Sequence, residues 1–537
     1  MKPRRPHFLP STCLLGLAIL GCDGGSTNLN AQPDAAAHEA GPAPEAGSPV
    51  DAAPMDDRGF ASDSADVTTT VDAADAGEPP EASDAKVCDP TEAPQDDPCV
   101  LSGAYGLFVS PQGVDTNPGT PTAPLKSVAL AVERASTAGQ ARVYLCNGVY
   151  SEAVHLLSGV SLYGGFDCSG DAGIRYVDGT FATISPPSNH IALIVDGVDA
   201  AVAVEDIGFR AADGVGDDDA GNGQSSVAVL VNASTATFRR CILTAGNGDQ
   251  GADGQTPSNY MGTSAPDGTV NNGGLGGAGG SITCANGSVS FGGGGGGLTS
   301  GAIGGDGGAT PMASAMPDLD GIGGACEGDT GASGSGSTLG GVAPIEPGVL
   351  TPLGWISSAG GVGGAGGPGQ GGGGGGQSGT FGGMGGGAGG CGGAGGTGGG
   401  GGGASIALAI LNGHVDIDGC MLVTSIGGNG GRGGDGQSGQ GGGVSPQGAS
   451  GVCPGGTGGN GGGGAGGAGG TGGIAACTIW SGTGPVGTAL CSLGDQGRPG
   501  LGGAGGLGGM SALGTASAGS SAAAGQPGIA QAQFGLP

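Results

Sequence analysis

The sequence predicts an all-β protein in which parallel strands coil around one hydrophobic core and long glycine-rich segments interrupt the coil. Three observations lead to this prediction. Leucine and β-branched residues are dense only at about 100–247 and again at 404–426, and three ten-residue segments within these regions align without gaps. Glycine supplies 138 of the 537 residues. Because glycine buries no side chain and loses the most backbone entropy on ordering, the core must lie in the two denser regions.

The composition divides the chain into seven segments. We assign 1–21 to an export signal, 22–87 to a disordered acidic tether rich in alanine and proline, 88–247 to an N-terminal cap with the first turns of the coil, 248–403 to a glycine-rich insertion, 404–426 to a returning turn, 427–475 to a second glycine-rich insertion, and 476–537 to a low-complexity C-terminal segment.

The first residues have the pattern of an export signal. Lys2, Arg4 and Arg5 precede the apolar run 14–20, which is too short to span a bilayer. The run ends at Leu20-Gly21-Cys22, which resembles the lipobox of bacterial lipoproteins. The resemblance implies that Cys22 carries a lipid through a thioether. Acyl chains contribute roughly 0.8 kcal/mol per buried methylene, so two or three of them would hold the protein at a membrane. The alternative is plain secretion.

The tether and the net charge restrict the partners. Residues 23–87 contain few large apolar side chains and do not offset their ordering entropy. The formal charge is −31, and without Lys2, Arg4 and Arg5 the remaining chain has 45 acidic and 14 − 3 = 11 basic residues. The electrostatic field of this negative charge repels the phosphate backbone of nucleic acids, so we expect no nucleic-acid partner. The expected location is the cell envelope, at the outer membrane or cell surface.

From Gly106 onward the sequence pattern changes to short predicted strands that alternate with turns. Phe108-Val109 begins a strand, and Pro124 sits well for the start of a helix that places Leu125, Val128, Val132 and Ala135 on one face. Short strands then follow between Asn-Gly and Ser-Gly turns. The segment 106–167 resembles the opening turns of pectate-lyase-like, right-handed parallel β-helix proteins. This resemblance implies that the helix covers the open end of the coil.

An internal repeat supports the coil independently. The three aligned segments are VAVEDIGFRA, ATFRRCILTA and VDIDGCMLVT, beginning at Val202, Ala236 and Val415. Their alternate residues match in kind, which predicts four inward columns of stacked side chains: Val202/Ala236/Val415, Val204/Phe238/Ile417, Ile207/Cys241/Cys420 and Phe209/Leu243/Leu422. The second and third repeats are then successive turns, with 248–403 as one loop between them, because loop-closure entropy grows slowly with length. The alternative is two separate domains.

Parts of the glycine-rich segments have a period of three. Ala388, Cys391, Ala394 and Thr397 are spaced three apart among paired glycines. The period suits bundles of extended polyglycine helices, which have three residues per turn, and it differs from collagen, which has one glycine in three and abundant proline. The composition resembles that of PE-PGRS-type glycine-rich repeat proteins. The alternative is a flexible, disordered loop.

Twelve cysteines remain once Cys13 is assigned to the signal and Cys22 to the lipid. An even number in an exported chain indicates disulfides. Cys88–Cys99 and Cys146–Cys168 are the pairs closest in sequence, while Cys241 and Cys420 share one predicted column and either bond to each other or pack as buried thiols. No CxxC pair occurs, and no structural metal or other cofactor is indicated.

A catalytic set is hard to find in the sequence. Asp217, Asp218 and Asp219 form an acidic run, but they lie in a glycine-rich loop, where a solvated turn competes with a weak calcium site. Arg239-Arg240 is interpreted as a solvent-facing corner rather than a binding site for an acidic sugar. No GxSxG, HExxH or GK[ST] motif occurs.

The sequence therefore favours a lipid-anchored, non-enzymatic envelope protein with a structural, adhesive or glycan-contacting role. The expected partners are a membrane, through the lipid, and polysaccharide or extracellular matrix. A polysaccharide lyase or glycoside hydrolase with a divergent site is the alternative, and a domain that binds ice or another repetitive surface is a third hypothesis.

Overall fold

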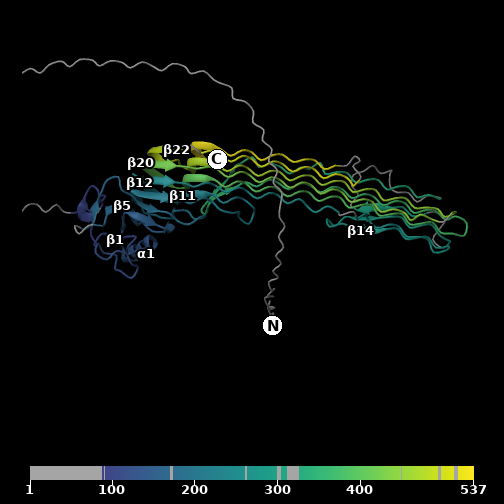
Figure 1. The fold of residues 1–537 in the computed structure, drawn as a ribbon, viewed down its shortest axis with the longest axis horizontal. Helices are drawn as coiled ribbons and strands as arrows, with labels where there is room; N and C mark the ends of the chain where they lie inside the picture. Colours follow the sequence, from purple (N-terminus) through teal and green to yellow (C-terminus); the bar gives the residue numbers. More distant parts are fainter. Residues whose placement is uncertain are drawn as a thin grey trace, which may run out of the picture. The chain divides into compact units, whose positions relative to one another are not determined.

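The core of the protein is a set of short parallel strands that follow one another around three faces (Figure 1). We describe it from a computed structural model, which describes residues 88–89, 91–169, 173–260, 263–298, 304–310, 326–448, 450–493, 497–512 and 518–537. The export signal, Cys22 and the tether lie outside the described residues. The fold is mostly β, and its long parallel sheets curl round one axis, an arrangement compatible with a parallel β-helix.

Two faces belong to one twelve-stranded sheet because β20 (His414–Val423) continues round the corner between them. The first face contains β1 (Gly106–Val109), β2 (Arg142–Cys146), β5 (Ser161–Asp167), β9 (Val202–Glu205), β12 (Thr235–Arg239) and the start of β20, with the short antiparallel β6 (Arg175–Tyr176) beside β5. β22 (Val486–Ser492) pairs along β20 on both sides of the corner and so belongs to the first and the second face. The second face contains β3 (Gly148–Tyr150), β7 (Ala182–Ile184), β10 (Ile207–Arg210), β13 (Ile242–Thr244) and the end of β20.

The third face is a separate six-stranded parallel sheet. Its strands are β4 (Val154–Leu156), β8 (Leu193–Asp196), β11 (Ser226–Asn232), β19 (Ser405–Leu411), β21 (Ala475–Ser481) and β23 (Ala530–Gly535). Along the chain, each turn of the coil therefore visits the first, second and third face in that order.

The predicted columns are present. Phe238 pairs with Val204 on one side and Ile417 on the other, and Leu243 lies between Phe209 and Leu422. All of these side chains are buried in one cluster. Because β12 pairs directly with β20, the second and third repeats are successive turns of one coil, and the alternative of two separate domains is wrong.

One end of the coil is covered by α1 (Val128–Ala138), while the segment with the short 3₁₀ helix η1 (Pro98–Val100) packs against the outward side of the first face, where the Tyr144 hydroxyl donates to Val100 O at 2.7 Å. The helix begins at Val128, later than the predicted Pro124, because the Ser127 hydroxyl caps it by accepting from Leu130 N. The Glu152 carboxylate also accepts from Val128 N and Ala129 N, at 2.7 and 3.2 Å. Val128, Ala131, Val132 and Ala135 of the helix are buried against the coil.

The glycine-rich segments all leave the coil at the same corner, between the second and third faces. They follow β10, β13, β20 and β22 and comprise the described residues of 211–225, 245–404, 424–474 and 493–529. The predicted low-complexity segment 476–537 contains β22 and β23, which add a further turn to the coil.

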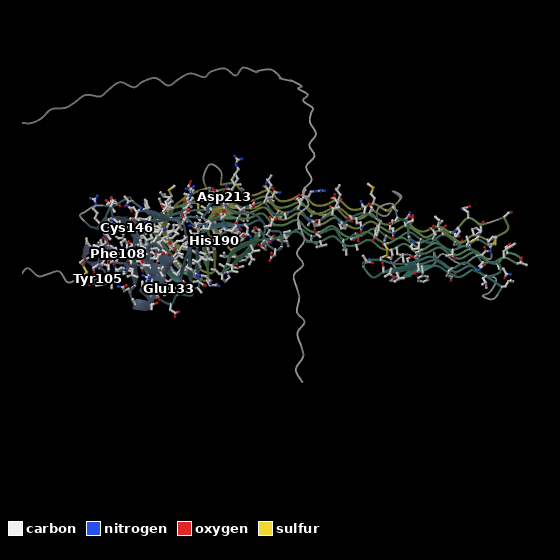
Figure 2. The ribbon with its side chains drawn as sticks, turned by 60° about the horizontal axis from the view of Figure 1, so that its bottom comes forward. Tyr105, Phe108, Glu133, Cys146, His190 and Asp213 are labelled. Carbon is white, nitrogen blue, oxygen red and sulfur yellow. A yellow bond between two sulfur atoms is a disulfide. The ribbon has the colours of Figure 1, made fainter. Side chains whose placement is uncertain are left out.

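Outside the coil these segments run side by side as extended, wavy chains (Figure 1). We call them the glycine slab, which comprises the described residues of 246–280, 292–307, 326–342, 358–404, 424–444, 454–474 and 497–529. Two small antiparallel sheets interrupt it: β14 (Ser281–Thr283), β15 (Val289–Phe291) and β16 (Gly308–Thr310), and the hairpin of β17 (Gly348–Thr351) and β18 (Gly354–Ser357). Side chains crowd the coil but are short and widely spaced along the slab (Figure 2).

Candidate functional site

Hydrogen bonds between neighbouring segments hold the slab together, and they recur every third residue. The amides of Gly458, Gly461 and Gly464 donate to the carbonyls of residues 443, 440 and 437, and the same period continues to Gly473. This is the pattern of packed extended helices with three residues per turn. The predicted period-three packing is therefore present in the structure, in place of a disordered loop.

Close backbone contact explains the paired glycines. A Cβ at Gly463 would overlap the carbonyl oxygen of Gly509, and a Cβ at Gly464 would overlap that of Ala394. The third position of this segment is less restricted, and it holds Ala465, Ala468 and Thr471, all fully buried. The Gly-Gly-X pattern thus provides two backbone contacts and one side chain per turn.

One broad surface of the slab carries a regular array of side chains. Along 424–444, every third residue from Asn429 to Val444 is exposed or half-buried, and most residues between them are buried. Beside this row, Leu501, Ala504, Leu507 and Met510 are exposed at the same spacing. At about 3.1 Å per residue, the side chains repeat every 9 Å or so. We call this surface the outer face.

Side chains of one segment satisfy backbone amides of the next across the outer face. Asp253 Oδ1 accepts from Arg432 N at 2.7 Å, Thr256 Oγ1 from Asp435 N at 2.9 Å, and Asn259 Oδ1 from Ser438 N at 3.0 Å. Each of these pairs is 179 residues apart, as are Cys241 and Cys420 in the core of the coil. The slab therefore keeps the register of the coil from which its segments emerge.

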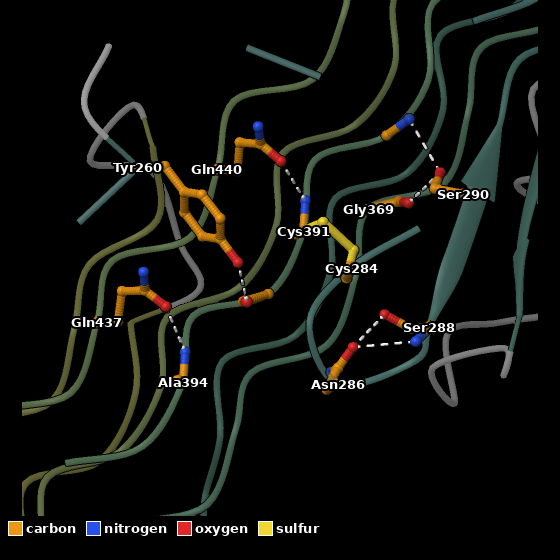
Figure 3. The surroundings of a disulfide bond; sticks show 12 residues. Tyr260, Cys284, Asn286, Ser288, Ser290, Gly369, Cys391, Ala394, Gln437 and Gln440 are labelled. Carbon is orange, nitrogen blue, oxygen red and sulfur yellow. Dashed lines mark hydrogen bonds between the residues drawn. A yellow bond between two sulfur atoms is a disulfide. The ribbon is translucent and has the colours of Figure 1, made fainter. Parts of the chain in front are cut away.

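The far part of the slab is fixed by buried polar groups and a disulfide (Figure 3). Gln440 Oε1 accepts from Cys391 N at 3.1 Å, and Gln437 Oε1 accepts from Ala394 N at 2.8 Å. Cys391 is bonded to Cys284, and the Tyr260 hydroxyl donates to Gly392 O at 3.2 Å. These contacts tie four segments that are distant in sequence into one unit.

The acidic run does not converge on a metal site. Asp217 and Asp219 are exposed, while the Asp218 carboxylate accepts from Ala220 N, Asn222 N and Asn222 Nδ2 within its own turn, at 2.9, 2.8 and 3.1 Å. Among the described residues, the one trio with metal-ligand spacing is Cys88, Asp97 and Cys99. Its two sulfur atoms are joined as a disulfide.

Arg240 lies in an ion cluster that the sequence analysis did not anticipate. Its guanidinium donates through Nε and a terminal nitrogen to both oxygens of Asp206, each at 2.8 Å, and to Glu205 Oε2 at 2.8 Å. Arg239 adds a longer contact of 3.7 Å to Glu205. Both carboxylates are buried, and burial raises the pKa of Glu205, whereas the hydrogen bond to Asp206 raises the pKa of Arg240. Because each carboxylate is bound to Arg240, the cluster is organised for stability.

Ten of the twelve cysteines form disulfides. The bonds join Cys88–Cys99, Cys146–Cys168, Cys284–Cys391, Cys326–Cys453 and Cys477–Cys491. Cys241 and Cys420 are buried thiols, with Cys241 N donating to Cys420 Sγ at 3.2 Å, and burial raises the pKa of Cys241. Five disulfides indicate an extracytoplasmic protein. No helix within the described residues has the length and apolarity to cross a membrane.

Comparisons with known proteins found no matching family model, curated protein or solved structure. The residues that the sequence analysis missed are those whose partners are distant in the chain: Glu205 and Asp206 with Arg240, and the capping side chains of the outer face. One signal was present in the sequence, because Asp253, Thr256 and Asn259 each precede their partner by the 179-residue offset that separates the second and third repeats.

Proposed function

We propose that this protein is a lipid-anchored component of the bacterial cell envelope that acts without catalysis, in a structural, adhesive or glycan-contacting role. Cys22 would be the lipidated residue, and the coil would be a right-handed, pectate-lyase-like parallel β-helix with PE-PGRS-like glycine-rich insertions. The five disulfides support a location outside the cytoplasm.

The structure of the glycine slab is the main support for the proposal. Segments from separate turns of the coil leave at one corner and join into one hydrogen-bonded body with a regular outer face. A catalytic or small-molecule site is typically concave, with a few converging polar groups. An extended surface whose side chains repeat every 9 Å or so suits a large or repetitive partner instead, such as a polysaccharide or a matrix.

Metabolic labelling with an alkyne-bearing fatty acid tests the anchor. We expect the full chain, expressed in a bacterial host that exports lipoproteins, to be labelled and recovered with membranes. Cys22→Ser should abolish the label and release the protein, while Cys13→Ser, a matched change inside the predicted signal, should leave both unchanged. Equal labelling of the two variants would contradict the anchor.

Binding of cells that display the protein tests the role. Cells that carry the full chain should adhere to immobilised polysaccharide or matrix more strongly than cells that lack it, and protease applied to whole cells should remove the difference. Equal adhesion in both strains would contradict an adhesive role.

Degradation of glycans would instead favour the alternative, a polysaccharide lyase or glycoside hydrolase with a divergent site. The observation behind it is the acidic run on the loop before β11. If the full chain produces new reducing ends or unsaturated products from uronic-acid or neutral glycans, and Asp217→Ala or Asp218→Ala abolishes them, the non-enzymatic proposal is wrong. We expect no such products.

A further inference from the structure

The row of side chains on the outer face has one gap. Along 424–444, the outward positions hold Asn429, Arg432, Asp435, Ser438, Gly441 and Val444 in turn. Gly441 is the one position in this row without a side chain. A Cβ built there would be in ordinary van der Waals contact with Ser264 Oγ at 3.7 Å, Ala512 Cβ at 3.8 Å and Asn460 Oδ1 at 3.9 Å, so a methyl group would fit without overlap but a longer side chain would reach past these neighbours.

The gap opens into a cavity of about 580 Å³ on the outer face, at the part of the slab far from the coil. This volume lies within the range of about 300–1,000 Å³ that is common for small-ligand sites. Its lining comes from segments that are distant in sequence, including Tyr260, Ser264, Asn460 and Met510. The site therefore exists only when the slab is assembled.

The polar lining is uncharged and has a fixed orientation. Asn259 Oδ1 accepts from Ser438 N at 3.0 Å, and Asn460 Oδ1 accepts from Gly442 N at 3.1 Å. Since a backbone N–H must meet the amide oxygen, the NH₂ group of each asparagine is left as a donor. The hydroxyls of Ser264 and Ser438 both donate and accept. Among the described residues, no lysine, arginine, aspartate or glutamate lines the cavity.

Two larger side chains give the cavity an apolar part. The Tyr260 ring is held in place by the hydrogen bond from its hydroxyl to Gly392 O, at 3.2 Å (Figure 3). Met510 also belongs to the lining and is exposed. Amphipathic rings such as tyrosine present an apolar body beside a polar tip, which suits a ligand with one apolar face and a polar edge.

We propose that this cavity binds one neutral sugar unit of a polysaccharide. Hydroxyl groups at the edge of the sugar would bond to Asn259, Asn460 and the serines, and its C–H face would rest on Tyr260 and Met510. An anionic unit is disfavoured because the described lining contains no cationic side chain and the chain carries a formal charge of −31. An apolar ligand would cover the asparagine NH₂ donors and leave them without partners, which is unfavourable.

This inference rests on the proposed glycan-contacting role and is tested by filling the gap. Binding of the full chain is measured by calorimetry with neutral oligosaccharides of glucose, mannose, galactose and N-acetylglucosamine, and with oligogalacturonate as the anionic comparison. We expect the wild type to bind at least one neutral series and Gly441→Leu to weaken that binding at least tenfold. The matched control is Gly294→Leu, at an exposed glycine whose nearest contact to an added Cβ is 3.8 Å; it should change binding less than twofold.

A second variant keeps the fold while changing the chemistry. Asn460→Asp retains the oxygen that accepts from Gly442 N, but it replaces the NH₂ donor with a negative charge, and it should also weaken neutral-sugar binding at least tenfold. Unchanged neutral-sugar binding in both Gly441→Leu and Asn460→Asp would overturn the site, while adhesion of cells with the full chain would still support the proposed function. Wild-type binding to oligogalacturonate alone, or to none of the probes, would overturn the neutral-sugar assignment.

Discussion

At the scale of single residues, the corners of the coil are unusual because some residues other than glycine adopt positive φ angles there. Asp206 and Arg240 have positive φ angles of 56° and 51°, and Gly165 and Gly419 have 81° and 60° at the equivalent corner of adjacent turns. A residue other than glycine pays a penalty of order 1–3 kcal/mol in such a conformation unless its surroundings hold it. The paired hydrogen bonds between Arg240 and Asp206 supply that support.

The cluster predicts a stability change with a defined pH dependence. Arg240→Met should lower the free energy of unfolding by about 3–5 kcal/mol at pH 7, because two buried carboxylates lose their cation. Burial already raises the pKa of Glu205 above its ordinary 4.5 in the folded state. An acid with a raised folded pKa stabilises the fold below its unfolded pKa and loses that contribution as the pH rises through the folded value. The defect of Arg240→Met should therefore shrink toward pH 4.5.

Urea unfolding of the full chain at pH 7 and pH 4.5 checks this. Arg210→Met, at an exposed arginine of the same coil, is the control and should change stability by less than about 0.5 kcal/mol. An equal loss at both pH values would show that the charge of the carboxylates is not the cause.

At the scale of elements, the coil and the slab were predictable to different degrees. The columns through Phe238 and Leu243 followed from the alternation of apolar residues, because a parallel strand must repeat its inward face from turn to turn. The period of three in the slab was visible at Cys391, Ala394 and Thr397. The choice of neighbours was not, because any Gly-Gly-X segment can pack against any other, and only sparse side chains such as Asp253 and Asn259 select the register.

The strands of the last turn were missed for a related reason. β22 and β23 carry few large apolar residues, and most of their positions are exposed. These segments become strands because they pair with β20 and β21, and their local composition gives no sign of that pairing. The ion cluster was missed because the two carboxylates that bind Arg240 are not its neighbours in the sequence. Asp206 and Glu205 lie 34 and 35 residues earlier.

Close backbone packing predicts that the glycines of the slab differ sharply in how well they tolerate substitution by alanine. Gly464→Ala should lower the free energy of unfolding by about 1–3 kcal/mol, because the new methyl group overlaps the Ala394 carbonyl oxygen. Gly294→Ala adds the same methyl group at an exposed position with room for it, and should change stability by less than about 0.5 kcal/mol. Calorimetric unfolding of both variants makes the comparison, and equal stabilities would contradict the packing.

At the scale of the whole molecule, the slab depends on the coil. A hydrogen bond contributes a net 0.5–1.5 kcal/mol or so, whereas ordering one residue's backbone costs about 1–2 kcal/mol, and more for glycine. Hydrogen bonds alone thus leave the slab marginal. The coil fixes where each segment starts, and the disulfides Cys284–Cys391 and Cys326–Cys453 join distant segments, the second of them across two different insertions.

Hydrogen exchange of the full chain, followed by mass spectrometry, tests the central claim that the insertions form one hydrogen-bonded body on the coil. Most amides of 428–443 and 458–473 donate across segments, so we expect them to remain protected for minutes to hours, as we also expect for strands β12 and β19. Exchange of these glycine amides within seconds, while the strands of the coil stay protected, would contradict the slab and leave only the coil.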